Sequence, residues 1–360
     1  MIFLLSVSIL VVVAIFGVVL GAASKSPWPK ILYVIAGVFF VCGLVTYTPD
    51  WDGYSYWMSN DAGRDIVFQF LSALYRDNGY EYSALHMTYV LLHAIILVYL
   101  ASKLTKNYFI VVFIYISIIY LFYTTQIRFF LAYFLFAFGA YCLVIDRRHW
   151  RSALFFVAAV LNHSALILMA PLVLLFYVSP KKLGRSILFL ASGFWTIALL
   201  LNLTALLPAG AEYFSSYISS DAERPGLLGS FLVFGPYILS SALLYFFIRG
   251  KAGGYRSLEE NPLLRYSWYM ALTPMVYLPI AMGLQIVGHR FIVSSLIFHL
   301  CAWMSLFKVQ LKFSKELRYG VLIGIWSIFL SFTYLIPSLF GMDSYLDSSL
   351  KVFGSNMFFR

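Results

Sequence analysis

The chain has 360 residues, of which 62% are hydrophobic and only 11% charged, with a formal net charge of +10 at pH 7. This composition excludes a soluble globular protein and describes a chain that lies mostly within a bilayer. Its apolar runs are long and rich in Leu, Ile and Phe, which predicts α-helical spans and excludes a transmembrane barrel. The three cysteines lie in apolar runs and offer no disulfide or metal-site spacing.

The predicted fold is an all-α polytopic integral membrane protein with about 10–12 transmembrane helices. We treat 1–360 as a single transmembrane domain. Apolar runs predict spans at 2–23, 30–47, 83–101, 108–123, 129–145, 186–207, 231–248, 266–282, 291–307 and 319–340. The first has no basic residue before it and Lys25 and Lys30 after it, which places the N-terminus outside.

The stretch 152–178 is harder to assign, because basic clusters flank it on both sides. One crossing would place one of these clusters outside, and two full crossings need about 40 residues. We therefore expect two short helices that meet near Asn162-His163-Ser164, forming a broken hairpin. A single long tilted helix is the alternative.

The charges follow the predicted topology. Lys and Arg concentrate in the loops placed inside, and Asp and Glu concentrate in those placed outside. The positive net charge is thus a sign of membrane orientation, and it gives no support to nucleic-acid binding. The charges therefore predict which face of the membrane each loop occupies.

Two outer segments stand out. The first, 48–82, holds many acidic and aromatic residues, and Ile66, Phe70 and Leu74 recur in it at helical spacing. That pattern predicts an amphipathic helix at the membrane interface. The second, 208–230, predicts another short amphipathic helix before the Pro225-Gly226 breaker.

Several short motifs occur in a distinctive order. They are Asp52-Gly-Tyr54, Arg64-Asp-Ile-Val-Phe-Gln-Phe-Leu71, Gln126-Ile-Arg128, Asn162-His163-Ser164-Ala165-Leu166 ahead of Pro171, and Gly288-His-Arg290. Together they resemble the Wzy/EpsG-like polysaccharide polymerases, membrane glycosyltransferases of the broad GT-C type. The resemblance covers about 47–305. Asp65-Ile66 stands where the family pattern has an acidic residue followed by proline.

The resemblance implies an enzyme that joins oligosaccharide repeat units carried on undecaprenyl pyrophosphate. It also implies a multi-pass protein of a bacterial inner membrane, with its active site facing the periplasm. The implied partners are that lipid-linked oligosaccharide, the bilayer and a chain-length regulator protein. An acceptor hydroxyl would attack an anomeric carbon while the lipid pyrophosphate departs. Such a reaction needs cations at the pyrophosphate, a base near the hydroxyl and surfaces for sugars.

Arg128 and Arg290 are the candidates for binding the pyrophosphate. Each opens a predicted span at the outer face and has no acidic residue nearby in the sequence, and the guanidinium fork suits phosphate oxygens. We expect the two to bind one pyrophosphate together, with Arg128 the more sensitive, and we assign Arg128 a catalytic role in stabilising the leaving group. The alternative is that they reach headgroups or pair with outer-loop aspartates.

His163 is the candidate for a general base or for a hydrogen-bond donor to the pyrophosphate. A purely structural role, holding the helix break together, is equally compatible with the sequence. His289, beside Arg290, is a weaker candidate for the pyrophosphate.

Asp50 and Asp52 form a pair that would suit a divalent cation or the deprotonation of a hydroxyl. We expect no metal and no other cofactor, because arginines already serve the leaving group, and we assign Asp52 a catalytic role. The candidates for sugar contacts are Asp50, Tyr54, Arg64 and Arg224. Tyr54 also suits the aromatic belt of a membrane interface.

Two other functions fit a polytopic basic chain. A flippase or transporter for lipid-linked sugars would show internal repeats and ionisable residues at mid-membrane, and the sequence has no evident repeat. An O-antigen ligase would share the arginines and the histidine and differ only in its acceptor, whereas a membrane acyltransferase would need a route for an acyl donor.

Overall fold

The structure is a computed structural model that describes residues 27–60, 65–203, 227–250, 254–282, 285–309, 314–339 and 345–357. Within these ranges the regular elements are helices, apart from one isolated bridge between Val45 and Asn356. Six of the described helices are long and apolar enough to cross a membrane, and Pro27–Cys42 and Ser164–Tyr177 are shorter apolar helices. The chain is therefore an all-α polytopic membrane protein, as predicted. The expected number of crossings stays a prediction.

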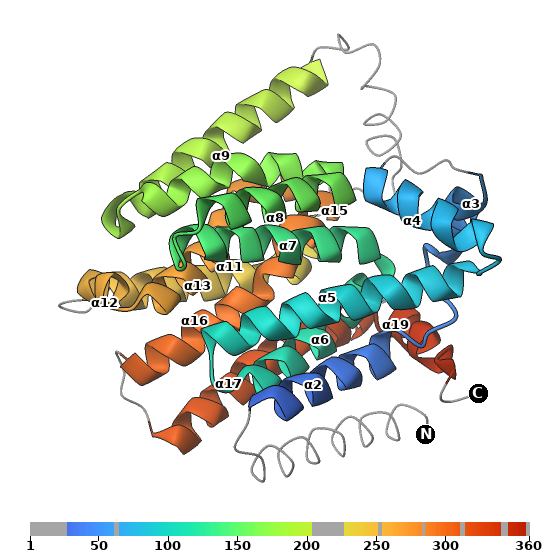
Figure 1. The fold of residues 1–360 in the computed structure, drawn as a ribbon. Helices are drawn as coiled ribbons and strands as arrows, with labels where there is room; N and C mark the ends of the chain where they lie inside the picture. Colours follow the sequence, from blue (N-terminus) through green and yellow to red (C-terminus); the bar gives the residue numbers. More distant parts are fainter. Residues whose placement is uncertain are drawn as a thin grey trace. The chain divides into compact units, whose positions relative to one another are not determined.

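The chain divides into two compact units, 1–169 with 341–360, and 170–340. The helices of the first unit are α2 (Pro27–Cys42), α3 (Trp51–Asn60), α4 (Ile66–Asp77), α5 (Tyr82–Leu104), α6 (Tyr108–Thr125), α7 (Ile127–Val144), α8 (His149–Asn162) and α19 (Tyr345–Gly354). Figure 1 shows α5, α6, α7 and α8 running side by side, with α3 and α4 across one end. The prediction of one transmembrane domain stays a prediction.

Helix α7 forms the core of the first unit, and nearly all of its residues are buried. Its closest neighbour is α8, and Gly139 permits the approach. A Cβ atom built at Gly139 would lie 2.9 Å from Cδ1 of Phe156 and 3.2 Å from Cβ of Phe155. Small residues at such points let membrane helices pack closely without a hydrophobic driving force between them.

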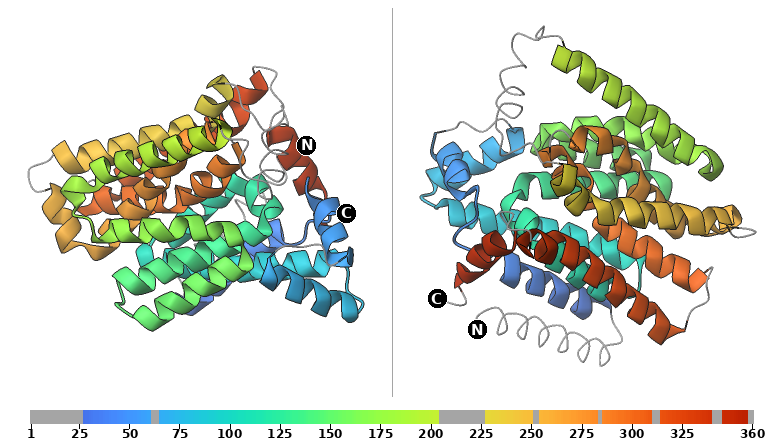
Figure 2. Two further views of the ribbon diagram at one scale, coloured as in Figure 1. Left: turned by 90° about the horizontal axis from the view of Figure 1, so that it is seen from above. Right: turned by 180° about the vertical axis from the view of Figure 1, so that it is seen from behind.

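The C-terminal segment closes the first unit by holding the end of α2. The side-chain amide of Asn356, which is 1% exposed, donates to the carbonyls of Phe40 and Val41 at 2.8 and 3.3 Å. Thr46 Oγ1 donates to the carbonyl of Ser355 at 2.8 Å. In both views of Figure 2 the red C-terminal helix lies beside the blue start of the unit. This contact fixes the residues that lead into α3.

The helices of the second unit are more often interrupted. They are α9 (Pro180–Leu203), α11 (Leu227–Gly250), α12 (Gly254–Glu260), α13 (Pro262–Leu272), η3 (Thr273–Tyr277), α14 (Leu278–Ala281), α15 (Gln285–Phe291), η4 (Val293–Ser295), α16 (Leu296–Val309), α17 (Lys315–Leu330), η5 (Ser331–Leu335) and α18 (Ile336–Leu339). The 3₁₀ segment η1 (Ser164–Tyr177) runs across the boundary between the units.

Several predicted boundaries need correction. The run predicted at 266–282 is broken into α13, η3 and α14, because Pro274 and Pro279 cannot continue an α-helical hydrogen-bond ladder. The run predicted at 291–307 contains the 3₁₀ turn η4. There the hydroxyl groups of Ser294 and Ser295 donate back to the carbonyls of Arg290 and Ile292.

The difficult stretch 152–178 is interrupted where the sequence predicts. Helix α8 ends at Asn162, His163 is extended (φ −153°, ψ 108°), and η1 begins at Ser164. A single uninterrupted helix is thereby excluded, and the hairpin itself stays a prediction. The predicted span 2–23 and the predicted outer segment 208–230 lie mainly outside the described residues.

Candidate functional site

The first element of the candidate site is a buried ion pair between Arg128, at the start of α7, and Asp65, the residue before α4. Nη1 of Arg128 lies 2.7 Å from Oδ2 of Asp65, and the two side chains are only 11% and 5% exposed. The partners are 63 positions apart in the sequence. Of the alternatives for Arg128, the structure therefore shows pairing with an outer-loop aspartate.

Three aromatic rings enclose the same guanidinium group. Cζ of Arg128 lies 5.0, 4.8 and 4.9 Å from the ring centroids of Tyr54, Trp57 and Phe68. Cation–π contacts of this kind contribute about 1 kcal/mol or more each when water is excluded. Helices α3 and α4 therefore meet the start of α7 around one buried cation.

The carboxylate of Asp65 also holds the break between α8 and η1. Its Oδ1 accepts hydrogen bonds from the backbone N–H of Ser164 at 3.0 Å and from the Ser164 hydroxyl at 3.2 Å. From the other side, the amide of Asn162 donates to the carbonyl of Arg128 at 2.6 Å. With the ion pair, three donors satisfy the carboxylate, which offsets much of the cost of burying it.

His163 lies between these two anchors, and it is 9% exposed. Its Nδ1 accepts the backbone N–H of Ala165 at 3.3 Å, and its ring meets the ring of Phe129 edge-on at 5.6 Å between centroids. This contact is compatible with the tautomer that carries its proton on Nε2. The donor role and the general-base role of His163 both stay predictions.

The other predicted residues of the first unit lie at different depths. Asp52 is exposed in the first turn of α3, and Asp50 is exposed just before that helix. Tyr54, a candidate for sugar binding, is 6% exposed, and its ring faces Arg128 and stacks on Tyr82 at 5.8 Å. Arg64 lies outside the described residues, as does Arg224 of the second outer segment.

In the second unit, His289 and Arg290 lie on the short helix α15. His289 is 8% exposed, with its ring 6.1 Å from that of Phe234. Gly288 makes this packing possible, because a Cβ there would lie 2.1 Å from Cζ of Phe234 and 2.9 Å from Cβ of Ala281. The absence of a side chain at 288 therefore sets how closely α15 packs.

Arg290 differs from Arg128 in its partners. Its Nε is buried without a hydrogen-bond partner, and none of the ion pairs found in the described ranges involves it. The expectation that Arg128 and Arg290 bind one pyrophosphate together stays a prediction. In the described part of the chain, a carboxylate pairs with Arg128, and none pairs with Arg290.

Sequence reasoning missed the main partners of Arg128. Asp65 was noticed only as a departure from the family pattern, and Trp57 and Phe68 were assigned no role at the arginine. One signal was available, since the flanks of Arg128 lack acids and the segment 48–82 is rich in them. Which of its several acids would pair was not visible, because contacts across 63 positions leave no local pattern.

In the part of the chain that the structure describes, no three His, Cys, Asp or Glu side chains form a group able to hold a metal ion. The expectation that no metal is needed stays a prediction. The site as described offers instead a buried cation, a buried carboxylate and an imidazole, drawn from α4, α7 and the α8–η1 break.

Comparison with known families matches residues 30–346 to the EpsG family. The chain belongs to the EpsG family. EpsG membership supports a general role in polysaccharide polymerisation, by a membrane-embedded protein resembling a glycosyltransferase. The match spans both units and includes every element of the candidate site. Searches of curated proteins and of solved structures found no match.

Proposed function

We propose that this EpsG protein is a polysaccharide polymerase that joins oligosaccharide repeat units carried on undecaprenyl pyrophosphate. The reaction takes place at the outer leaflet of a bacterial inner membrane. The growing chain leaves one lipid pyrophosphate and is transferred to a sugar hydroxyl of another lipid-linked unit. The partners are the lipid-linked oligosaccharide, the bilayer and a protein that regulates chain length.

One observation carries this proposal. Residues from three of the family-like motifs, Asp65, Arg128 and Asn162 to Ser164, meet in one cluster although they are far apart in the sequence, and its members other than Ser164 are buried. Buried ionisable groups at the end of a membrane span are expensive and are functional candidates by default. His163 stands in the chain between Asn162 and Ser164, which both belong to this cluster.

The chemistry assigns different tasks to the two arginines. Arg128, whose charge is already paired with Asp65, acts in this proposal as a positioning residue that holds α3, α4 and the α8–η1 break together, in place of the direct pyrophosphate contact expected from the sequence. Arg290 binds the departing pyrophosphate, which carries a dense negative charge at the depth of the headgroups. In the first unit, His163 is our candidate for a hydrogen-bond donor to a pyrophosphate oxygen.

The acceptor hydroxyl needs a base, and Asp52 is our candidate for it. Asp52 is exposed in the first turn of α3. It lies two positions before Tyr54, one of the three rings that enclose the guanidinium group of Arg128. A carboxylate that is open to solvent can meet a sugar hydroxyl without prior rearrangement of the core. Asp50 and the loop arginines Arg64 and Arg224 provide further polar contacts to sugars.

Deletion of the gene in its native host, followed by gel analysis of the surface glycan, tests the proposal. A polymerase predicts the loss of long chains while single repeat units persist at the surface. Loss of all surface sugar would instead support a flippase or an O-antigen ligase. Restoration of long chains by the wild-type gene controls for effects on neighbouring genes.

A further inference from the structure

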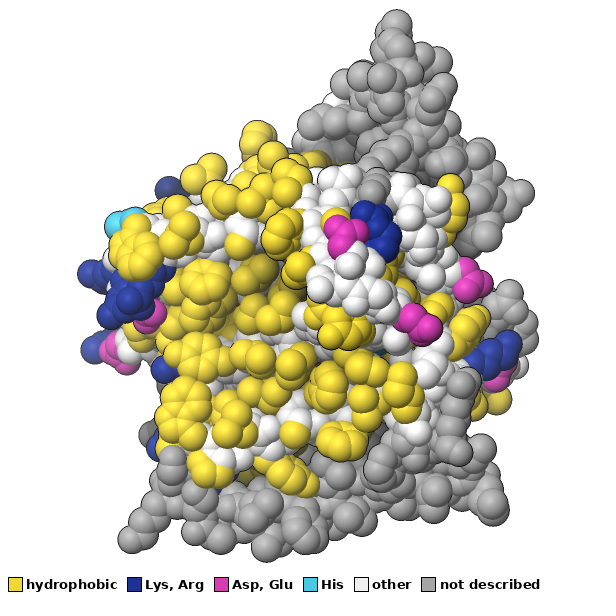
Figure 3. All heavy atoms as spheres, turned by 45° about the vertical axis from the view of Figure 1, so that its right-hand side comes forward, with side chains coloured by type: hydrophobic (Ala, Val, Ile, Leu, Met, Phe, Trp, Pro, Cys, Tyr) yellow, Lys and Arg dark blue, Asp and Glu magenta, His cyan; other side chains and the backbone are white. Residues whose placement is uncertain are grey.

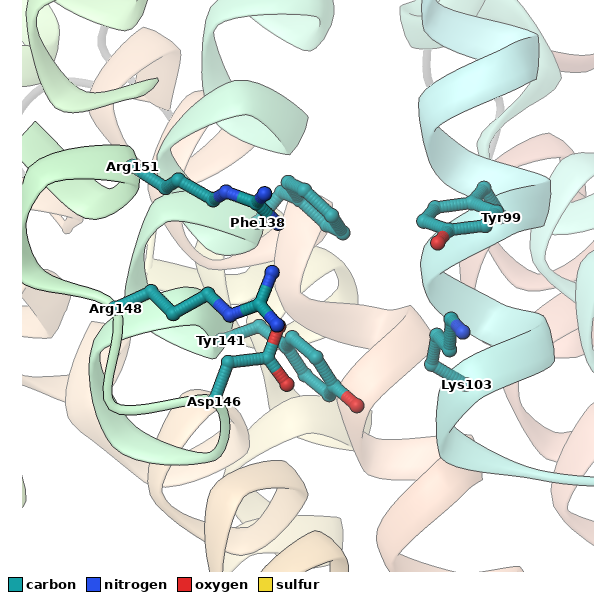
Figure 4. Close-up of a pocket in the computed structure, with 7 residues that line it drawn as sticks. All are labelled: Tyr99, Lys103, Phe138, Tyr141, Asp146, Arg148 and Arg151. Carbon is teal, nitrogen blue, oxygen red and sulfur yellow. The ribbon is translucent and has the colours of Figure 1, made fainter. Parts of the chain in front are cut away.

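A second polar site lies at the opposite end of the first unit. A pocket of about 300 Å³ is lined by Tyr99 and Lys103 of α5, by Phe138 and Tyr141 of α7, and by Asp146, Arg148 and Arg151 around the start of α8. Figure 4 shows the two arginines reaching in from one side, with Tyr99 and Lys103 on α5 across from them.

The pocket is built for an anion. Three cations and one carboxylate line it, and all four side chains are on exposed residues. Helix α8 also begins here, at His149, and its N-cap residue makes no side-chain capping hydrogen bond. The positive end of the helix dipole therefore adds to the charge of the arginines.

The turn that carries Arg148 has a defined shape. Arg147 adopts a left-handed backbone (φ 54°), and the backbone N–H of Arg148 donates to the carbonyl of Cys142 at 2.9 Å. The backbone N–H of Ser152 in turn donates to the carbonyl of Arg148 at 3.0 Å. The backbone of Arg148 is thus held at both its N–H and its C=O group, and its side chain lines the pocket.

The surroundings favour a lipid over a water-soluble anion. Three aromatic rings line the pocket, and exposed apolar side chains adjoin it on both helices: Ile95, 41% exposed, lies one turn before Tyr99, and Leu154, 59% exposed, lies one turn after Arg151. Figure 3 shows a basic cluster at the left edge of this face, with a broad hydrophobic surface extending from it. Aromatic and basic residues beside an apolar surface mark the level of the headgroups.

This pocket is separate from the site around Arg128. The two sites lie near opposite ends of α7, about 20 Å apart along its axis at the α-helical rise of about 1.5 Å per residue. Orientation in the membrane requires basic residues in this loop, but it does not require that they line a pocket together with aromatic rings. We propose that the pocket binds the phosphate headgroup of an anionic diacyl phospholipid, whose acyl chains lie along the exposed apolar faces of α5 and α8.

Thermal unfolding of the delipidated full-length protein in detergent tests this. The midpoint is followed against increasing phosphatidylglycerol, against phosphatidylcholine with the same acyl chains, and against glycerol 3-phosphate. A ligand that binds only the folded state raises the midpoint with concentration. Phosphatidylglycerol should act at about tenfold lower concentration than phosphatidylcholine, and glycerol 3-phosphate should have little effect.

Combining Arg148→Gln with Arg151→Gln should remove this preference, because each arginine near a headgroup contributes about fivefold in affinity. The residues are exposed, so the variant should fold, and Lys103→Gln gives a milder version of the same change. The control combines Arg147→Asn with Lys106→Gln. It removes the same charge from nearby positions outside the pocket, and asparagine tolerates the left-handed backbone at 147.

The proposal predicts that the control keeps the preference for phosphatidylglycerol. If the control lost this preference to the same extent as the double arginine variant, the preference would come from general charge attraction, and the proposed binding site would be overturned. A stabilisation by glycerol 3-phosphate as large as that by phosphatidylglycerol would overturn the assignment to a lipid.

Discussion

At the scale of single residues, the buried pair of Arg128 and Asp65 decides how the candidate site is understood. The sequence shows an arginine without a local counterion, and such a cation calls for either a protein partner or an anionic substrate. Asp65 supplies the protein partner at 2.7 Å, and three aromatic rings enclose the guanidinium group of the arginine. Arg128 is therefore expected to support the site through the fold, and the first consequence concerns stability.

Replacing Arg128 by alanine should lower the free energy of unfolding by about 3–5 kcal/mol, because it leaves the carboxylate of Asp65 buried without its cation. Asp65→Asn with Arg128→Gln should recover part of this loss, since neither charge then remains. Thermal unfolding in detergent measures both. The control is Arg256→Ala, which breaks an exposed pair with Glu260 (79% and 64% exposed) and should cost less than about 0.5 kcal/mol. An Arg128→Ala protein that unfolds like the wild type would contradict this prediction.

Replacing Arg290 by alanine should lower activity and leave stability nearly unchanged, whereas replacing Arg128 should lower stability. If Arg290 stabilises the departing pyrophosphate, the rate of polymerisation should fall about a hundredfold or more, while the unfolding midpoint changes little. Arg290→Lys should restore only part of the rate, because a point charge replaces a bidentate fork. Arg249→Gln, at the last turn of α11, is a matched control on an exposed residue. Normal polymerisation by Arg290→Ala would remove Arg290 from the active site.

At the scale of elements, hydrophobic run length predicted the long apolar helices α5, α6 and α7 of the first unit. The runs predicted at 83–101, 108–123 and 129–145 correspond to α5, α6 and α7 within a few residues. Run length does not show where the backbone departs from the α-helix, as at Pro274 and at the serines of η4, because these residues remain compatible with a membrane-spanning run. Helix α3 was missed, since its mixed polar and aromatic residues show no clear apolar periodicity.

The break at His163 was predicted and its cause was not. Polar residues inside an apolar run mark a point where backbone groups need other partners. The sequence shows where these residues occur, but it does not show that Asp65, 99 positions away from Ser164, accepts the freed N–H. The sequence therefore predicted which residues belong to the candidate site, but it did not predict which of them contact one another.

The C-terminal contact gives a prediction at the same scale. Asn356→Ala should lower the free energy of unfolding by about 1–3 kcal/mol, because it removes two buried hydrogen bonds to the end of α2. Asn78→Ala removes an exposed hydrogen bond of the same type, to the carbonyl of Leu74 at 2.7 Å, and should cost much less. Thermal unfolding of the two variants compares them directly. Equal losses of unfolding free energy would show that the contact of Asn356, in the segment after α19, does not hold the end of α2.

At the scale of the whole molecule, the distribution of charge gives the orientation. The pocket end of the first unit is basic, and the end with α3 and α4 holds most of its acids. Both flanks of 152–178 are basic, so both are expected to face the cytoplasm. The acidic end is then the outer one, where the proposed reaction takes place.

Labelling from outside with a membrane-impermeant thiol reagent checks this orientation. Asp52→Cys should be labelled and Lys182→Cys should not, until the membrane is opened. The native Cys42, Cys142 and Cys301 are buried, so their background should be low. Labelling of Lys182→Cys from outside would contradict the placement of 152–178.

The most direct test of polymerase activity uses the purified full-length protein in liposomes, supplied only with undecaprenyl-pyrophosphate-linked repeat units. The account predicts a ladder of lipid-linked oligosaccharides, each longer by one repeat unit, with one undecaprenyl pyrophosphate released for each bond formed. Chelator should leave the ladder unchanged, since the leaving group is held by side chains. Repeat units that cross the bilayer or remain unchanged, with no new glycosidic bond and no released pyrophosphate, would contradict the account.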